Sequence, residues 1–194
     1  MTIKMTKTGE WDKYRKALDP KAFKLLLDKE MSAATRLNVV LVRDEIQRRI
    51  MNGDYAPNAP MTKAMKGSDK PLVDDGDLVK AINDRLINHY MGFVGIQRGT
   101  MKTGDGGAEE MVNIALILHE GTTIKVTPRM RAYFYYLARK SGGKVKPLKA
   151  TTKTIVIPPR KFIEEPVSEP AIRDRCMTNW GHALQRSMAP GKVA

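Results

Sequence analysis

The feature that most limits how this chain can fold is a run of about thirty residues whose apolar positions recur every three or four residues, which predicts one long helix over 20–51. Asp19-Pro20 supplies an N-cap and a first-turn proline, and Gly53 follows the last turn. At 1.5 Å per residue such a helix spans about 45 Å. That exceeds what one compact domain needs, so we expect part of it to pack on something else. The apolar positions are Phe23, Leu26, Leu27, Met31, Ala34, Leu37, Leu41, Ile46 and Ile50.

After this helix, short helices and strands alternate, which predicts an α+β fold with a small mixed or antiparallel sheet flanked by helices. Residues 52–76 are rich in Pro, Gly, Asn and Asp and predict a long ordered loop. Asp75 or Asp77 caps a predicted helix with Leu78, Ile82 and Leu86 on one stripe, and a strand or short hairpin around Gly92 follows over 87–97. Further helices are predicted over 108–119 and 127–142, and strands over 122–126 and 151–157.

A C-terminal helical extension is predicted over 163–194, with its helix beginning near Pro170. The apolar residues of this helix recur at a strict four-residue spacing, and they are Ile172, Cys176, Trp180, Leu184 and Met188. Residues 1–18 read as a polar arm. The length of 194 residues then predicts a single domain over 19–194.

The charge is strongly basic and unevenly placed. The formal net charge is +13, residues 121–160 hold ten basic and no acidic side chains, and residues 71–120 hold an acidic excess. A basic balance of this kind favours polyanionic or acidic partners. In an oligomer, the basic segment of one subunit can equally meet the acidic segment of its neighbour.

Several classes of function find no support in the sequence. One cysteine excludes an internal disulfide framework and CxxC-type metal or redox sites, and no apolar run is long enough to cross a membrane. No secretory leader is present, which predicts a reducing cytoplasm or a particle assembled there. The TGDGG loop at 103–107 lacks phosphate-loop spacing, and no nucleophile elbow or metal-ligand cluster is present. We expect no enzyme activity, no cofactor and no metal site.

Four consecutive aromatic residues, Tyr133-Phe134-Tyr135-Tyr136, stand among arginines and lysines in the 127–142 helix. Aromatic and cationic side chains together can stack on bases of single strands. The alternative turns Met130, Phe134, Leu137 and Ala138 inward and leaves the tyrosines at a subunit interface, where this residue type is enriched. The interface is favoured, because no nucleic-acid motif accompanies the cluster.

Three segments together resemble the virion-morphogenesis family of tailed phages, which includes tail-completion and neck proteins of Mu-like and related phages. They are KGSDKPLVDDGDLVKAI (66–82), LHEGTTIKVTPRMRAYFYYLA (118–138) and IVIPPRKF (155–162). The matching positions are Lys66, Pro71, Leu72, Asp75, Gly76 and Leu78, then His119, Gly121, Thr127, Met130 and Arg131, then Ile157, Pro158, Arg160 and Phe162. The chain departs from the family at Gly76, which directly follows Asp75, and at Lys161, which replaces a second proline.

The resemblance implies a structural, non-catalytic protein at the head–tail joint of a virion, assembled in the bacterial host cytoplasm as a ring around the DNA channel. Six subunits are preferred and twelve stay open, and the partners would be other neck, connector or tail proteins and the genomic DNA. The interface residues expected from the tyrosine cluster and these motifs are Asp75, Arg131, Tyr133, Tyr136, Arg160 and Phe162.

A second hypothesis is a basic nucleic-acid-binding protein. Its phosphate contacts would come from the lysines of the 121–160 segment, namely Lys140, Lys144, Lys146, Lys149 and Lys153. The two hypotheses are compatible, because a neck ring surrounds DNA. Only the second requires binding to DNA in free solution.

Overall fold

The structure is a computed structural model that describes residues 9, 19–73, 76–98, 101–102 and 109–188. The chain groups into two compact units. Of the described residues, those within 19–42, 84–94 and 169–188 belong to the first unit, and those within 43–83 and 95–168 belong to the second. The prediction of a single domain over 19–194 stays a prediction, which a melt with one cooperative transition would support. The predicted arm, Asp75 and the TGDGG loop lie outside the described residues.

The predicted long helix is confirmed. Helix α2 runs from Pro20 to Asn52 over 33 residues. The Asp19 carboxylate accepts a hydrogen bond from the Lys21 backbone N–H at 3.1 Å, which satisfies a first-turn donor. Gly53 ends the helix at φ +81°, where its N–H reaches the Arg49 carbonyl at 3.0 Å. The capping residues Asp19 and Gly53 therefore predicted both ends of the helix correctly.

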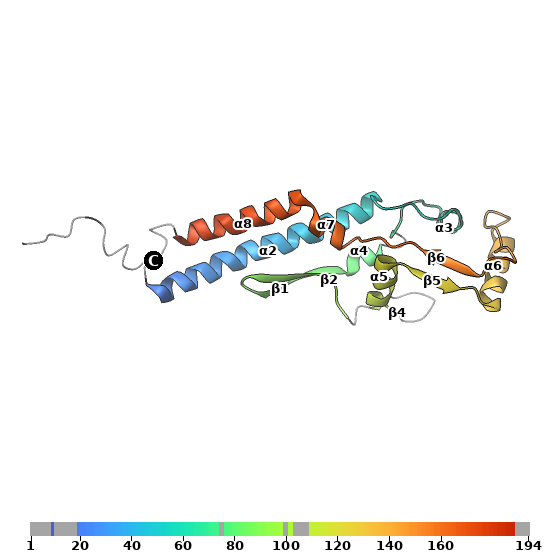
Figure 1. The fold of residues 1–194 in the computed structure, drawn as a ribbon, viewed down its shortest axis with the longest axis horizontal. Coiled ribbons are helices and arrows are strands. Elements are labelled where there is room, and N and C mark those ends of the chain that lie inside the picture. The colour runs from blue at the N-terminus through green and yellow to red at the C-terminus, as the bar shows by residue number, and fades with distance from the viewer. Residues whose placement is uncertain (1–8, 10–18, 74–75, 99–100, 103–108, 189–194) are drawn as a thin grey trace, which may run out of the picture. The chain divides into compact units, whose positions relative to one another are not determined.

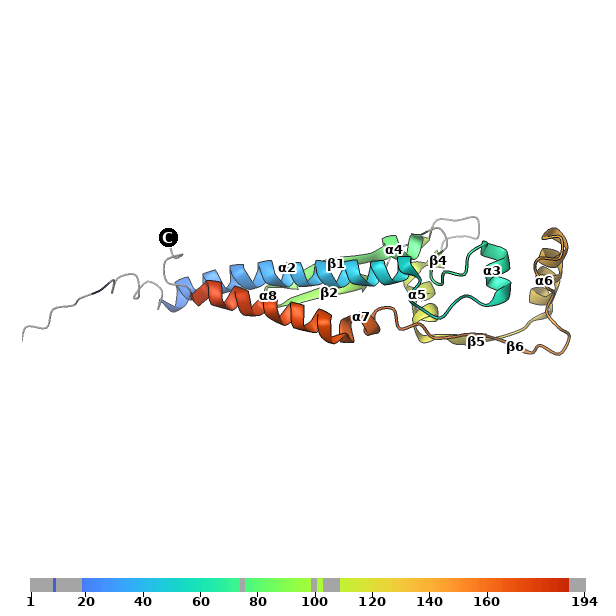
Figure 2. The same ribbon diagram turned by 90° about the horizontal axis from the view of Figure 1, so that it is seen from above.

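In the first unit, α2 lies beside the C-terminal helix α8 (Pro170–Met188), and both views of the ribbon show the pair side by side (Figures 1 and 2). Polar groups join the two helices. The Trp180 indole N–H donates to Thr35 Oγ1 at 3.1 Å, and Asn179 Nδ2 donates to Asn38 Oδ1 at 2.7 Å. These bonds satisfy buried polar groups and fix the register of one helix against the other.

The expected stripe on α8 is only partly buried. Ile172 is buried, but Leu184 and Met188 are exposed, and Ala183 and Ser187 take their place against the rest of the unit. A four-residue step advances 400° around a helix with 3.6 residues per turn, so each step moves the side chain about 40° further from the first. A strict four-residue spacing therefore rotates out of the contact after two turns.

The predicted helix over Asp77 to Leu86 is wrong beyond its first turn. Helix α4 covers Asp77–Ala81 only, and strand β1 (Ile82–Asn88) follows and pairs with β2 (Met91–Ile96). A spacing of four residues is also a multiple of the two-residue period of a strand. Ile82 and Leu86 therefore share one strand face as readily as one helix face.

The β1–β2 turn falls at His89-Tyr90 rather than at Gly92, which the sequence had favoured. Asn88 Oδ1 accepts the Tyr90 N–H at 2.9 Å, an Asx-type turn contact. Gly92 instead sits inside β2, where a Cβ would collide with the Val39 side chain of α2. The glycine is explained by the close approach of strand and helix.

The core of the second unit forms where the end of α2 meets short elements from the middle of the chain. The buried apolar side chains include Ile46, Ile50, Leu72, Leu78, Ala81, Ile82, Met111, Ala115 and Phe162. Gln47 Nε2 donates to the carbonyls of Val79 and Ile82 at 3.0 and 3.2 Å. This side chain satisfies carbonyls at the end of α4, so α4 is fastened to α2.

Several shorter elements complete the second unit. The predicted loop over 52–76 contains helix α3 (Pro60–Lys66), and α7 (Glu164–Ser168) follows the IPPRKF segment. The third predicted helix begins later than expected: α5 covers Met111–Glu120, while β4 (Glu109–Glu110) pairs antiparallel with β3 (Met101–Lys102). The two glutamates thus belong to a strand and not to a first helical turn.

A two-stranded ribbon with a helix at its tip extends from this core, as both ribbon views show (Figures 1 and 2). Strand β5 (Thr122–Lys125) pairs antiparallel with β6 (Thr154–Ile157) in the register Ile124 to Ile155. Helix α6 (Pro128–Lys140) begins at Thr127, whose Oγ1 accepts the Met130 N–H at 3.2 Å. The predicted α+β class is therefore confirmed, with antiparallel pairing in both sheets whose register is defined. No helix among the described residues is long and apolar enough to cross a membrane.

Candidate functional site

Two sequence segments that carry the family resemblance meet at the base of the ribbon. The Arg160 N–H lies 3.1 Å from the Leu118 carbonyl and 3.2 Å from the His119 carbonyl, so the chain after β6 is tied to the end of α5. Gly121 lies between them at φ +73°, and a Cβ there would be 2.7 Å from the Ile157 carbonyl oxygen. The close approach of the two backbones explains why a glycine stands at this position.

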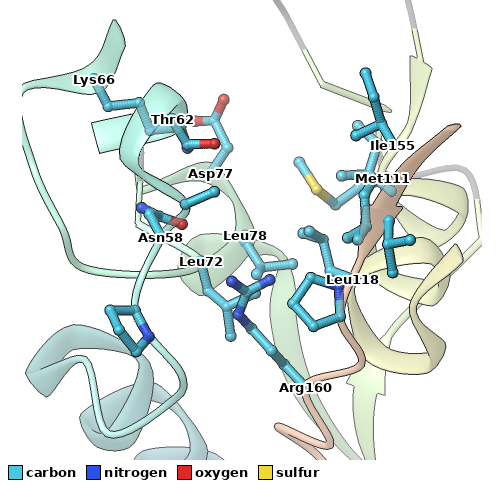
Figure 3. A pocket seen from close by; sticks show the side chains of 16 residues that line it. Asn58, Thr62, Lys66, Leu72, Asp77, Leu78, Met111, Leu118, Ile155 and Arg160 are labelled. Atoms are coloured by element: carbon cyan, nitrogen blue, oxygen red, sulfur yellow. The ribbon is translucent and has the colours of Figure 1, made fainter. Parts of the chain in front are cut away.

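A cavity of about 430 Å³ opens beside this junction, entirely within the second unit (Figure 3). One wall comes from the 57–78 region and the other from α5 and β6. Most of the lining is apolar, including Leu72, Leu78, Met111, Leu118 and Ile155. The polar groups are few, and they are Asn58, Thr62, Lys66, Asp77 and Arg160. A largely apolar cavity with a few polar groups is the usual form of a small-molecule site.

Arg160 is the unusual member of this lining. Only 8% of its surface is exposed, and Figure 3 shows its guanidinium among the side chains of the cavity, close to Leu72. Its Nε donates to the Ala56 carbonyl at 3.3 Å. Among the described residues it forms no ion pair with a carboxylate, and burial lowers its pKa. A mostly buried cation that no described carboxylate pairs with favours an anion in the cavity that it faces.

A second group of polar side chains lies on the outer side of the same junction. His119, Glu120 and Glu164 place ligand-type atoms within 4.8 Å of one another. The Lys161 ammonium already lies there, 2.8 Å from Glu120 and 3.6 Å from Glu164. Hydrogen bonds from Lys161 and His119 lower the pKa of the Glu120 carboxyl. The lysine supplies the positive charge that a metal ion would bring, so this cluster is explained as an ion-pair network.

The Phe162 ring is fully buried and packs edge-on against the His119 ring, with centroids 5.3 Å apart and planes at 83°. We therefore correct the prediction that Phe162 contacts a neighbouring subunit: its side chain belongs to the core of its own unit. Arg160 likewise faces its own cavity and not an open surface. The sequence motif that contains both residues carries no signal that separates a buried motif from an exposed one.

The tyrosine cluster lies on α6, at the tip of the ribbon. Tyr133, Tyr135 and Tyr136 are each more than half exposed, whereas Phe134 is half-buried, as the inward-facing set predicted. No residue of α6 is buried. The helix thus presents its aromatic side chains to the surroundings of the unit, and the interface prediction for Tyr133 and Tyr136 stays open to test.

The basic segment forms a loop that is anchored to α6. Arg131 donates from Nη1 to the Lys149 carbonyl at 2.9 Å and from Nη2 to the Thr152 carbonyl, so its guanidinium fastens the loop from within the unit. Val145 is buried, and its N–H donates to Ser141 Oγ at 3.0 Å. The five predicted DNA-facing side chains are all exposed, and they are Lys140, Lys144, Lys146, Lys149 and Lys153. None of them forms an ion pair with a described residue.

Sequence reasoning missed the lining of the cavity that comes from the 52–76 loop. Asn58 and Thr62 carry no motif, and their position depends on α3, which the loop-like composition concealed. Pro60 at the first turn of α3 and Gly67 after it, at φ +69°, are the local signals that indicate this helix. No protein-family model, curated protein or solved structure matches the chain.

Proposed function

We propose that this protein is a non-catalytic assembly component, of the kind found at the head–tail joint of tailed phages, which forms an oligomeric ring around a DNA channel. The observation that carries the proposal is the ribbon β5–β6 with α6 at its tip. Val156 on the ribbon is 66% exposed, Ile124 is exposed, and α6 has no buried residue. The motif resemblance of residues 66–162 supplies the setting in the virion.

A two-stranded ribbon is marginally stable on its own in water. Exposed apolar and tyrosine side chains on such an arm lose solvent contact when another protein surface covers them, and tyrosine is enriched at such interfaces. Within the part of the chain that the structure describes, no further strand pairs with the outer edge of β5 or β6, which leaves backbone groups available for pairing. A neighbouring subunit in a ring, contacted head to tail, satisfies all three features.

The test is the mass of the purified protein by light scattering on a sizing column, with electron microscopy of the eluted peak. We expect a discrete oligomer and ring-shaped particles with a central channel. The double variant Tyr133→Ser with Tyr136→Ser should shift the peak to smaller species. The matched double variant with phenylalanine keeps the aromatic area and should retain the oligomer. A monomer at every concentration and salt, unchanged by either variant, would contradict the ring.

DNA binding in free solution is the second candidate function, and the exposed lysines of the 140–153 loop favour it. If all five contact phosphates, the logarithm of affinity should fall with the logarithm of salt at a slope of about −4.5. Each Lys→Gln substitution should reduce that slope by about one. Fluorescence anisotropy with a labelled duplex measures it. An affinity that does not respond to salt would exclude this function.

A further inference from the structure

The cavity beside Arg160 contains a charge that the proposed assembly role does not use. A guanidinium has five N–H donors, and the structure records one side-chain hydrogen bond for Arg160, from Nε to the Ala56 carbonyl. Only 8% of the surface of the residue is exposed. The remaining donors belong to the fork, Nη1 and Nη2, whose planar geometry suits the two oxygens of a carboxylate.

The rest of the cavity defines what such an anion would be attached to. Leu72, Leu78 and Leu118 lie around the guanidinium in Figure 3 and offer an apolar path away from it. Asp77 lies closer to Thr62 than to Arg160 in the same view, and no carboxylate among the described residues forms an ion pair with the guanidinium. A volume of about 430 Å³ falls within the range of small-molecule sites.

We propose that this cavity binds a medium-sized organic acid, with its carboxylate on the Arg160 fork and its apolar body along the leucine-lined wall. The carboxylate supplies a counter-charge that no described residue gives the guanidinium, and charge-assisted bidentate hydrogen bonds are strong. Transfer of the apolar body from water to the cavity wall lowers the free energy of the complex. The site lies within one subunit, so it goes beyond the proposed assembly role and does not depend on it.

The experiment uses the full chain and two probes of matched length, octanoate and 1-octanol, with binding measured by titration calorimetry. Octanoate should bind at least about tenfold more tightly than octanol, the difference expected for one charge-assisted contact. Arg160→Gln should remove that preference and leave octanol binding unchanged. Lys161→Gln is the matched control, because it removes a neighbouring charge that belongs to the outer ion-pair network and does not line the cavity.

A second variant keeps the test decisive if Arg160→Gln fails to fold. Thr62→Trp fills the cavity from α3, where the side chain is not part of the core, and should weaken both probes. The proposal is overturned if octanoate does not bind, if it binds no better than octanol, or if Thr62→Trp leaves both affinities unchanged. Dissociation of an oligomer by octanoate would assign the cavity to an acidic side chain of a neighbouring subunit and would also overturn it.

Discussion

Replacing Gly121 by alanine tests the junction on which the ribbon and the cavity both depend. The added Cβ would lie 2.7 Å from the Ile157 carbonyl oxygen and 2.7 Å from the Pro159 nitrogen. Both atoms belong to the backbone, so no side chain can rotate away to make room. Gly121 also sits at φ +73°, a left-handed conformation that costs alanine about 1 kcal/mol.

The steric conflict adds to the conformational cost. Overpacking against fixed atoms typically costs about 1 to 3 kcal/mol, so Gly121→Ala should destabilise the protein by about 2 to 4 kcal/mol in total. Gly142→Ala is the matched control, because Gly142 has φ +61° and a Cβ there meets nothing within 4 Å. That variant should lose about 1 kcal/mol only.

Urea unfolding followed by circular dichroism measures both values. The difference between the two variants isolates the close approach of the α5 end to the chain after β6. Equal losses of unfolding free energy for Gly121→Ala and Gly142→Ala would refute the reasoning, because they would show that the backbone contact does not contribute to the cost of the substitution. A larger loss at Gly142 would refute it more strongly.

Three further predictions concern single side chains of the second unit. Arg131→Met removes the hydrogen bonds that hold the basic loop, so trypsin should cleave faster after the lysines of that loop. Arg129→Met removes an exposed arginine of the same helix and should leave the cleavage rate unchanged. Equal cleavage rates for the two variants would contradict the role of Arg131 in holding the loop. The hydrogen bond from Arg48 lowers the pKa of the Glu45 carboxyl from 4.5 to about 2, so its contribution to stability is present above pH 4.5 and is lost as the pH falls toward 2. Glu45→Gln should flatten that part of a plot of melting temperature against pH, and an unchanged plot would contradict the pairing. Burial raises the pKa of Tyr55 from 10.0 to about 12, so stability should fall as the pH rises from 10 to 12, and Tyr55→Phe should remove that fall in the same measurement.

The long helix was predictable because its signals were local and agreed with one another. Asp19, Pro20 and Gly53 each act on backbone groups within one turn, and the apolar period between them is long enough to exclude a strand. The same logic placed α6, whose N-cap Thr127 and first-turn proline are adjacent in sequence. Elements fixed by neighbouring residues can be read from neighbouring residues.

The failures share a different cause. Leu86 belongs to β1 because β2 pairs with it, and this pairing depends on residues further along the chain. The cavity is similarly non-local, since Arg160 is buried by a loop about a hundred residues earlier in the sequence. The motif around Arg160 was visible in the sequence, but its burial depends on the distant residues Ala56, which accepts its hydrogen bond, and Leu72, which lies beside it (Figure 3). Whether an arginine such as Arg160 faces a neighbouring subunit or its own core is decided by such distant segments.

The basic loop fastened by Arg131 has a consequence for how any contact made there would be regulated. Between residues 121 and 160 the sequence holds no carboxylate and no histidine, the side chains that ordinarily change charge between pH 4 and 8. A fall in pH over that range therefore does not change the charge of residues 121–160 themselves. A contact made through it would be released by ionic strength or by a competing polyanion, and it would keep the same strength in an acidified compartment as in a neutral one, provided that the partner's charge is equally constant.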